Sequence, residues 1–121
     1  NLDKDIEIYA DKGRLTQALT NTIGNAVKFT KKGYVTVESK FLAGENKIEI
    51  EISDTAGGIP KDILPKLFGK FVTKSIGNEN QHGTGLGLFI SKAIVTAHRG
   101  EIFAYNNNED GATFMIVLPA K

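Results

Sequence analysis

The residues that most clearly point to chemistry are three glycines at alternate positions, Gly83, Gly85 and Gly87. They follow a polar stretch, 75–82, and open a predicted helix, 86–97. A helix N-terminus presents free backbone N–H groups and the positive end of the helix dipole, so it can bind phosphate. Glycines let the backbone approach such a group closely. No Gly-Lys-Ser/Thr follows, as a P-loop requires, and Leu88 stands where a dinucleotide fingerprint needs glycine. A flexible loop closing onto a helix is the alternative.

A polar stripe on a predicted helix, 12–29, is a second candidate and carries Arg14, Asn21, Asn25 and Lys28. It lies roughly 150° around the helix from the leucine stripe, at about 100° per residue. Two asparagines one turn apart lower helix stability relative to Glu, Lys or Ala. An amide oxygen is a suitable ligand for Mg²⁺, and Lys28 is placed to reach a phosphate. A solvated helix face is the alternative.

Asp54 ends a predicted strand, 48–53, and Gly57 and Gly58 follow it. An ionised carboxylate only accepts hydrogen bonds. It therefore suits the exocyclic amine of adenine and would repel the carbonyl that guanine presents at that position. The two glycines would let a flat base lie against the backbone. An ordinary turn aspartate is the alternative for Asp54. Thr113 is either a plain strand residue or a hydroxyl near the base.

The loop at 61–83 has the composition of an active-site lid. It carries four lysines, one of them Lys74, against Asp62 and Glu79, and Phe68 and Phe71 lie in its first part. Long loops with charged residues and anchoring aromatics often close over active sites. A surface loop with two phenylalanines in a small apolar cluster is the alternative.

Composition excludes several classes of function. The 121 residues carry a formal net charge of +1, which gives no argument for nucleic acid or an anionic membrane as partner. Without cysteine, disulfides, thiol catalysis and Cys-ligated zinc are excluded. The two histidines do not make a metal cluster, and His98 is interpreted as a helix C-terminal residue favoured by the dipole. The length fits one domain, 1–121, and the start at Asn1 without Met indicates a piece of a larger protein.

Hydrophobic periodicity predicts the elements that position these residues. Apolar spacings of three and four predict the helix 12–29, and strict alternation predicts a hairpin of strands 35–41 and 48–53. Further strands are expected at 6–9, 102–105 and 113–118, with a short helix at 62–67 and a helix stop at Arg99-Gly100. This order predicts a two-layer α/β sandwich, in which about three helices cover one face of a mixed, mostly antiparallel sheet of about five strands.

In combination, these motifs resemble the catalytic, ATP-binding domain of sensor histidine kinases, in the gyrase, heat-shock-protein-90, histidine-kinase and mismatch-repair superfamily. The resemblance covers nearly the whole chain and implies its Bergerat-type ATP-binding fold. Residues 21–30 resemble the N box, 54–60 the first glycine box, 67–71 the F box, 83–88 the second glycine box and 111–114 the final glycine-threonine segment. Ala56 departs from the first glycine box, where glycine is typical, and we expect this small residue to be tolerated.

The resemblance also implies roles for individual residues. Asn25 would ligate Mg²⁺, and Asn21 and Lys28 would help to hold the triphosphate of ATP. Asp54 would recognise the adenine amine, with support from Thr113. The implied nucleotide-binding set is Asn21, Asn25, Lys28, Asp54, Gly58, Ile59, Lys74, Gly83, Thr84, Gly85, Leu86, Gly87 and Thr113.

In family terms, the γ-phosphoryl group of Mg-ATP passes to a histidine on a separate dimerisation and phosphoacceptor domain, and then to a response regulator. That acceptor domain is absent from the chain, so the chain alone is expected not to phosphorylate itself. In members that hydrolyse ATP, a glutamate stands four residues before the Mg-binding asparagine. Here that residue is Asn21, whose amide cannot take a proton.

Two other functions stay open at this point: a superfamily ATPase, and a non-catalytic nucleotide-binding interaction module. The chain is expected in the cytoplasm, with no nucleic acid and no direct membrane contact, whether or not its parent protein is membrane-anchored.

Overall fold

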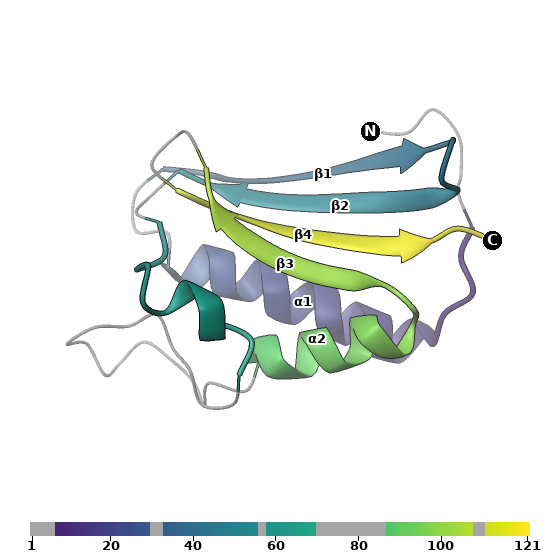
Figure 1. The fold of residues 1–121 in the computed structure, drawn as a ribbon, viewed down its shortest axis with the longest axis horizontal. Coiled ribbons are helices and arrows are strands. Elements are labelled where there is room, and N and C mark those ends of the chain that lie inside the picture. Colours follow the sequence, from purple (N-terminus) through teal and green to yellow (C-terminus); the bar gives the residue numbers. More distant parts are fainter. Residues whose placement is uncertain (1–6, 30–32, 56–57, 70–86, 108–110) are drawn as a thin grey trace.

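The structure, a computed structural model, describes residues 7–29, 33–55, 58–69, 87–107 and 111–121. Its helices are α1 (Lys12–Phe29) and α2 (Gly87–Ala97), with a 3-10 turn, η1 (Leu64–Lys66). Its strands are β1 (Val35–Leu42), β2 (Lys47–Asp54), β3 (Glu101–Asn106) and β4 (Ala112–Pro119). The strands form an antiparallel sheet in the order β1-β2-β4-β3, and both helices lie on one face of it (Figure 1). The predicted two-layer α/β sandwich is confirmed.

The alternating pattern of the strands decides which face of the sheet is buried. The predicted hairpin pairs β1 with β2. Farther into the sheet, Ile52 of β2 stands opposite Phe114 of β4, and Ile116 of β4 stands opposite Ile102 of β3. All four side chains are buried and belong to the hydrophobic core. Because successive residues of a strand point to opposite faces, Glu51 of β2 and Met115 of β4, which stand opposite each other, lie on the outer face.

Small side chains bring α1 and α2 together. Ala18, Thr22 and Ser91 are each fully buried. The carbonyl oxygen of Ala18 accepts hydrogen bonds from Oγ1 of Thr22, at 2.8 Å, and from Oγ of Ser91, at 3.0 Å. One carbonyl therefore satisfies both buried hydroxyls. The crossing fixes how the polar residues of α1 face the start of α2. In the part of the chain that the structure describes, no helix is both long and apolar enough to cross a membrane.

Two predicted elements are wrong in part. Of the predicted strand 6–9, residue 6 lies outside the described residues, and residues 7–9 are irregular. A backbone hydrogen bond of 2.7 Å, from the N–H of Lys121 to the carbonyl of Glu7, ties this short segment down, and Tyr9 is largely exposed. The predicted helix 62–67 is a turn followed by η1, because Pro65 lacks the N–H that an α-helix would need there.

The predicted end of α2 is confirmed, but a different residue makes the turn. Arg99, with φ at 67°, adopts the left-handed conformation that glycine usually supplies. Gly100 then donates its N–H to the carbonyl of Val95 at 2.9 Å. Its missing side chain matters for packing, because a Cβ there would collide with the carbonyl oxygen of Val117 and stand 2.8 Å from Cδ2 of Leu118. The glycine thus lets the start of β3 lie against β4.

Candidate functional site

One end of the sandwich gathers the predicted site residues that the structure describes. The ends of α1 and β2 meet the starts of α2 and β4 there, at the left of Figure 1, while the C-terminus lies at the other end. The helical layer contributes Asn21, Asn25 and Gly87, and the sheet contributes Asp54. Segments that are far apart in sequence are therefore brought to one place, as the predicted site requires.

Several predicted site residues lie outside the described residues. The same holds for most of the predicted lid, 61–83, and for His82. Lys28 belongs to the last turn of α1, but its side chain is not described. The residues concerned are Lys28, Lys74, Gly83, Thr84, Gly85 and Leu86.

In the helical half of the site, two asparagines of α1 face the first residue of α2. The amide nitrogen of Asn21 lies 3.5 Å from the carbonyl oxygen of Gly87, a long hydrogen bond. A Cβ on Gly87 would stand 3.4 Å from the amide nitrogen of Asn25, which is ordinary van der Waals contact. The start of α2 therefore lies directly beside the asparagines. The first N–H groups of α2, which have no partner within the helix, lie at this point.

Asn25 is held so that its oxygen is the atom it can offer to a ligand. Its amide nitrogen donates to the carbonyl of Asn21, one turn earlier, at 3.1 Å. The described residues contain no group of three or more His, Cys, Asp or Glu side chains that could enclose a metal. Mg²⁺ usually keeps several waters and binds through one or two protein oxygens and the phosphates of a substrate. The donor set therefore fits Mg²⁺ carried on a polyphosphate better than a metal held by protein alone.

In the sheet half of the site, Asp54 is a buried carboxylate with a fixed orientation. It is the last residue of β2, is only 3% exposed, and has the same parity as Ile52, so it lies on the helix side of the sheet. Its Oδ1 accepts the backbone N–H of Ala112 at 3.2 Å. Gly111 makes this possible, because a Cβ there would overlap the carbonyl oxygen of Asp54. An acceptor-only group is thus positioned at the end of the strand, as predicted.

The glycine segment after β2 is held by an asparagine that sequence reasoning missed. Oδ1 of Asn106 accepts the N–H of Ile59 at 2.7 Å, and Nδ2 of Asn106 donates to the carbonyl of Ile59 at 3.0 Å. Gly58 lies against this amide, since a Cβ would collide with Oδ1 and stand 2.9 Å from Cγ. A shallow cavity of about 600 Å³ lies beside these contacts, and its lining includes Gly58, Ile59, Pro60, Asn106, Asn107 and Gly111.

The structure does not place Thr113 beside the carboxylate of Asp54. Thr113 follows Ala112 in β4 and pairs with Ser53, so its side chain lies on the outer face of the sheet. Its hydroxyl is 3.0 Å from Oγ of Ser53 and accepts a hydrogen bond from Nδ2 of Asn107 at 3.1 Å. The predicted support of Asp54 by this hydroxyl is corrected: the backbone N–H of Ala112 contacts the carboxylate instead.

Asn107 is the second residue that sequence reasoning missed. Its Nδ2 donates to the main-chain carbonyl of Asp54 at 3.1 Å as well as to Thr113, and its Oδ1 accepts the N–H of Gly111 at 3.1 Å. It therefore holds the end of β2 against the start of β4. A signal was available in the sequence, because three consecutive asparagines, 106–108, directly follow the predicted strand 102–105.

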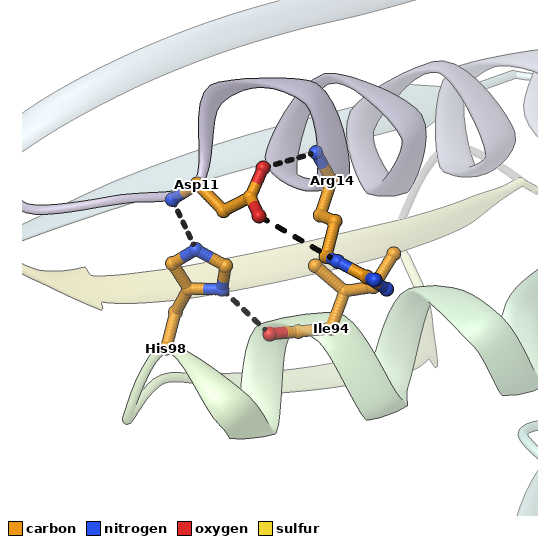
Figure 2. A network of polar contacts seen from close by, with 4 residues as sticks. All are labelled: Asp11, Arg14, Ile94 and His98. Carbon is orange, nitrogen blue, oxygen red and sulfur yellow. Dashed lines mark hydrogen bonds and ion pairs between the residues drawn. The ribbon is translucent and has the colours of Figure 1, made fainter.

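His98 belongs to the opposite end of the molecule, where it joins the two helices (Figure 2). Nδ1 of His98 donates to the carbonyl of Ile94 at 2.8 Å, and Nε2 accepts the backbone N–H of Asp11 at 2.9 Å. The carboxylate of Asp11 caps α1 by accepting the N–H of Arg14 at 3.1 Å and also pairs with its guanidinium at 3.5 Å. His98 thus connects the end of α2 to the start of α1. Its position directly after the last residue of α2 agrees with the prediction of a histidine at the helix C-terminus.

Comparison with known proteins agrees with this geometry. Residues 10–121 match the family described as histidine kinase-, DNA gyrase B- and HSP90-like ATPase. The chain is 38% identical over 125 residues to the autoinducer 2 sensor kinase/phosphatase LuxQ of Vibrio parahaemolyticus, covering 99% of this chain and 15% of that protein. It is 37% identical over 124 residues to hybrid signal transduction histidine kinase K of Dictyostelium discoideum, covering 93% of this chain and 10% of that protein. The chain therefore spans a small part of these relatives.

A solved structure shares the fold. Full-length ShkA in complex with AMPPNP superposes with a TM-score of 0.80 at 33% identity, covering 96% of this chain and 23% of that one. The match extends over both layers, because it covers nearly all of the sequence. The predicted fold class is thus supported by the observed elements and by a protein of known structure.

Proposed function

We propose, on the premise that this chain belongs to the histidine kinase-, DNA gyrase B- and HSP90-like ATPase family, that it is the part of a histidine kinase that binds Mg-ATP and donates the γ-phosphoryl group. The recipient is a histidine on a separate dimerisation and phosphoacceptor domain, from which the group passes to the receiver domain of a response regulator. The kinases LuxQ and histidine kinase K, which resemble nearly the whole chain, support this proposal.

The observation that carries the proposal is the meeting of two kinds of group at one end of the sandwich. Asp54 is a buried hydrogen-bond acceptor at the end of β2. Asn21 and Asn25 present amide groups beside the first residue of α2. One half suits the amine of adenine, and the other suits a Mg-bound polyphosphate at a helix N-terminus. AMPPNP, which is bound by ShkA, contains both an adenine base and a polyphosphate-like chain.

Each residue then has an assigned part in binding. Asp54 selects adenine, with its Oδ1 held by the N–H of Ala112. Asn25 offers its amide oxygen to Mg²⁺, which supplies charge neutralisation for the phosphates when it is bound. Asn21 and Lys28 hold the phosphates from α1. The proposed nucleotide-binding set also includes Gly58, Ile59, Lys74, Gly83, Thr84, Gly85, Leu86 and Gly87.

Catalysis in this proposal comes from positioning and charge neutralisation. During its transfer, a phosphoryl group requires little covalent chemistry from the protein, and its charge is stabilised by cations and N–H donors. A neutral imidazole nitrogen is already a nucleophile, so transfer to histidine has little need of a general base. Asn21 occupies the position where a hydrolytic relative carries glutamate, and its amide nitrogen faces Gly87. The site is therefore suited to phosphotransfer more than to activation of water.

Adenine recognition is tested by isothermal titration calorimetry with ADP and GDP in the presence of Mg²⁺. We expect the chain to bind ADP more tightly than GDP, and Asp54→Ala to weaken ADP binding by about a hundredfold, as loss of a hydrogen bond to a charged group permits. Glu45→Ala is the matched control, because it removes an exposed carboxylate in the β1–β2 turn at the other end of the sheet. Equal affinity for the two bases would contradict the assignment of Asp54.

The choice between kinase and ATPase is tested with γ-labelled ATP. The chain alone should release phosphate slowly or undetectably, although it binds nucleotide. Addition of the dimerisation and phosphoacceptor domain of its parent protein should yield phosphohistidine as the main product. Steady multiple-turnover phosphate release from the chain alone, abolished in Asn25→Ala, would favour the ATPase. Failure to bind ADP would favour a non-catalytic interaction module.

The cellular setting follows the same proposal. The partners are the acceptor domain of the same parent protein and a response regulator, with neither nucleic acid nor lipid in direct contact. The nucleotide supply of a kinase places this part of the protein in the cytoplasm.

A further inference from the structure

Asn106 makes a two-point contact with the main chain of Ile59. Its Oδ1 accepts the N–H at 2.7 Å, and its Nδ2 donates to the carbonyl at 3.0 Å. These are the contacts that a neighbouring strand would make in a ladder. The two residues are 47 positions apart, so the contact joins the end of β3 to the segment that follows β2. One side-chain amide thus replaces a peptide group.

This contact determines where the glycine segment lies. Residues 58–60 have no regular secondary structure, so no ladder fixes them. Gly58 lies directly against the amide of Asn106, where any Cβ would collide with Oδ1. The side chain of Ile59, only 4% exposed, inserts into the hydrophobic core. The amide on one side and the core on the other therefore hold the segment in one position.

We propose that Asn106 is a positioning residue for the adenine base, acting through the main chain of Gly58 and Ile59. The inference rests on the proposed function, in which Asp54 and Gly58 form the base pocket. The amide of Asn106 is engaged with the main chain of Ile59, so in this proposal it acts on the base through that main chain. It keeps the wall of the pocket at a fixed separation from Asp54, whose Oδ1 is oriented independently by the N–H of Ala112.

The chemistry of the contact explains why asparagine is suited to this place. Its planar amide presents a donor and an acceptor side by side, matching the N–H and carbonyl of one residue. Aspartate would place an acceptor against the carbonyl of Ile59. Serine retains one hydrogen-bonding group on a shorter side chain. The predicted order of nucleotide affinity is therefore Asn106, then Asn106→Ser, then Asn106→Ala.

The proposal separates base binding from phosphate binding. Asn21 and Asn25 belong to α1 and do not depend on the segment 58–60. Loss of the amide at position 106 should therefore weaken ligands that contain adenine and spare ligands that are phosphate alone. Asn106→Ala is expected to weaken ADP binding about tenfold, corresponding to about 1.4 kcal/mol, and to leave Mg-tripolyphosphate binding within about twofold of the wild type, since additive sites act independently.

In the experiment, ADP and Mg-tripolyphosphate are titrated into the wild type, Asn106→Ser and Asn106→Ala. Binding is monitored by amide NMR spectra, which report weak as well as tight binding. Asn46→Gly is the matched control. Asn46 lies in the β1–β2 turn with φ at 54°. Its side chain donates a hydrogen bond to the carbonyl of Ala120 at 3.2 Å. Glycine keeps that backbone conformation without strain and removes the hydrogen bond. This control should lose stability and keep both affinities.

The outcomes are distinct. A selective loss of ADP affinity in the order given supports the proposal. An ADP affinity unchanged within about twofold in Asn106→Ala, against about tenfold expected, overturns it. An equal loss for both ligands in a folded Asn106→Ser assigns Asn106 a general structural role and also overturns it. If the wild type binds no ADP, the proposed function itself fails. If Asn106→Ala does not fold, the serine variant carries the test.

Discussion

Replacing Gly111 by alanine probes the packing that orients Asp54. Gly111 is buried between the end of β3 and the start of β4. It donates its N–H to Oδ1 of Asn107 at 3.1 Å and accepts the N–H of Asn107 at 2.9 Å. A Cβ at this position would overlap the carbonyl oxygen of Asp54 and lie 2.7 Å from its Oδ1. The obstacle is largely backbone, so it cannot rotate away.

The magnitude follows from these contacts. To reach ordinary van der Waals contact, the distance to Oδ1 must grow from 2.7 Å to at least 3.4 Å, and the overlap with the carbonyl must be removed as well. Overpacking of this kind costs about 1–3 kcal/mol. The shift would also stretch the bond from the N–H of Ala112 to Oδ1, and a hydrogen bond contributes about 1 kcal/mol. We expect Gly111→Ala to lower the free energy of unfolding by about 2–4 kcal/mol.

The assay is urea unfolding followed by calorimetry with ADP on the folded variant. With a denaturant slope of about 2 kcal/mol per molar, the urea midpoint should fall by about 1 M or more. ADP affinity should also fall, because the carboxylate is displaced. Gly44→Ala is the control, since a Cβ at Gly44 meets nothing within 4 Å. An unchanged midpoint in Gly111→Ala, equal to that of the control, would refute the packing argument.

Three further outcomes follow from the same structure. Gly24→Ala, where a Cβ in the middle of α1 meets nothing within 4 Å, should raise stability by about 1 kcal/mol in urea unfolding; a loss would contradict the helix assignment. His98→Ala removes one hydrogen bond to the start of α1 and one to the last turn of α2, and it should lower the free energy of unfolding by about 1–2 kcal/mol with ADP affinity unchanged. After incubation with γ-labelled ATP, the chain alone should carry no acid-labile phosphate, and labelling of His82 or His98 would reject this expectation.

The regular elements were predictable because their signals are local. The helix 12–29 matches α1 at both ends, since its apolar stripe begins after a capping aspartate and runs unbroken. The hairpin of β1 and β2 follows from strict alternation on both sides of a turn. The strand expected at 6–9 had a much shorter signal. Alternation over four residues carries too little information to require a partner strand.

The placement of Thr113 was not predictable without the register. A residue and its neighbour in a strand point to opposite faces of the sheet. A shift of one residue in a motif match therefore moves the side chain to the other face, and the motif alone does not decide which face Thr113 occupies. The structure resolves this by pairing Thr113 with Ser53 on the outer face, while Ala112 lies at Asp54. The contacts of Asn106 and Asn107 cross 47 and 53 residues, and no local pattern encodes such pairings.

The site end of the sandwich poses a problem that the asparagines solve. Where β2 and β3 end and β4 begins, the ladder stops and backbone groups would lose their partners near a buried carboxylate, which is costly. Asn106 supplies a donor and an acceptor to Ile59, and Asn107 does the same for Asp54 and Gly111. The side-chain amides thus continue the ladder beyond the strands.

This solution in turn explains the glycines beside them. An amide that replaces a strand must lie as close to the next segment as a backbone would, which leaves no room for a Cβ at Gly58. At Gly111 the same crowding comes from the main chain of Asp54. Asparagine after a strand and glycine in the facing loops are therefore two consequences of one requirement. The loops must stay irregular enough to form a pocket while the carbonyl of Asp54, the peptide groups of Ile59 and the N–H of Gly111 keep partners.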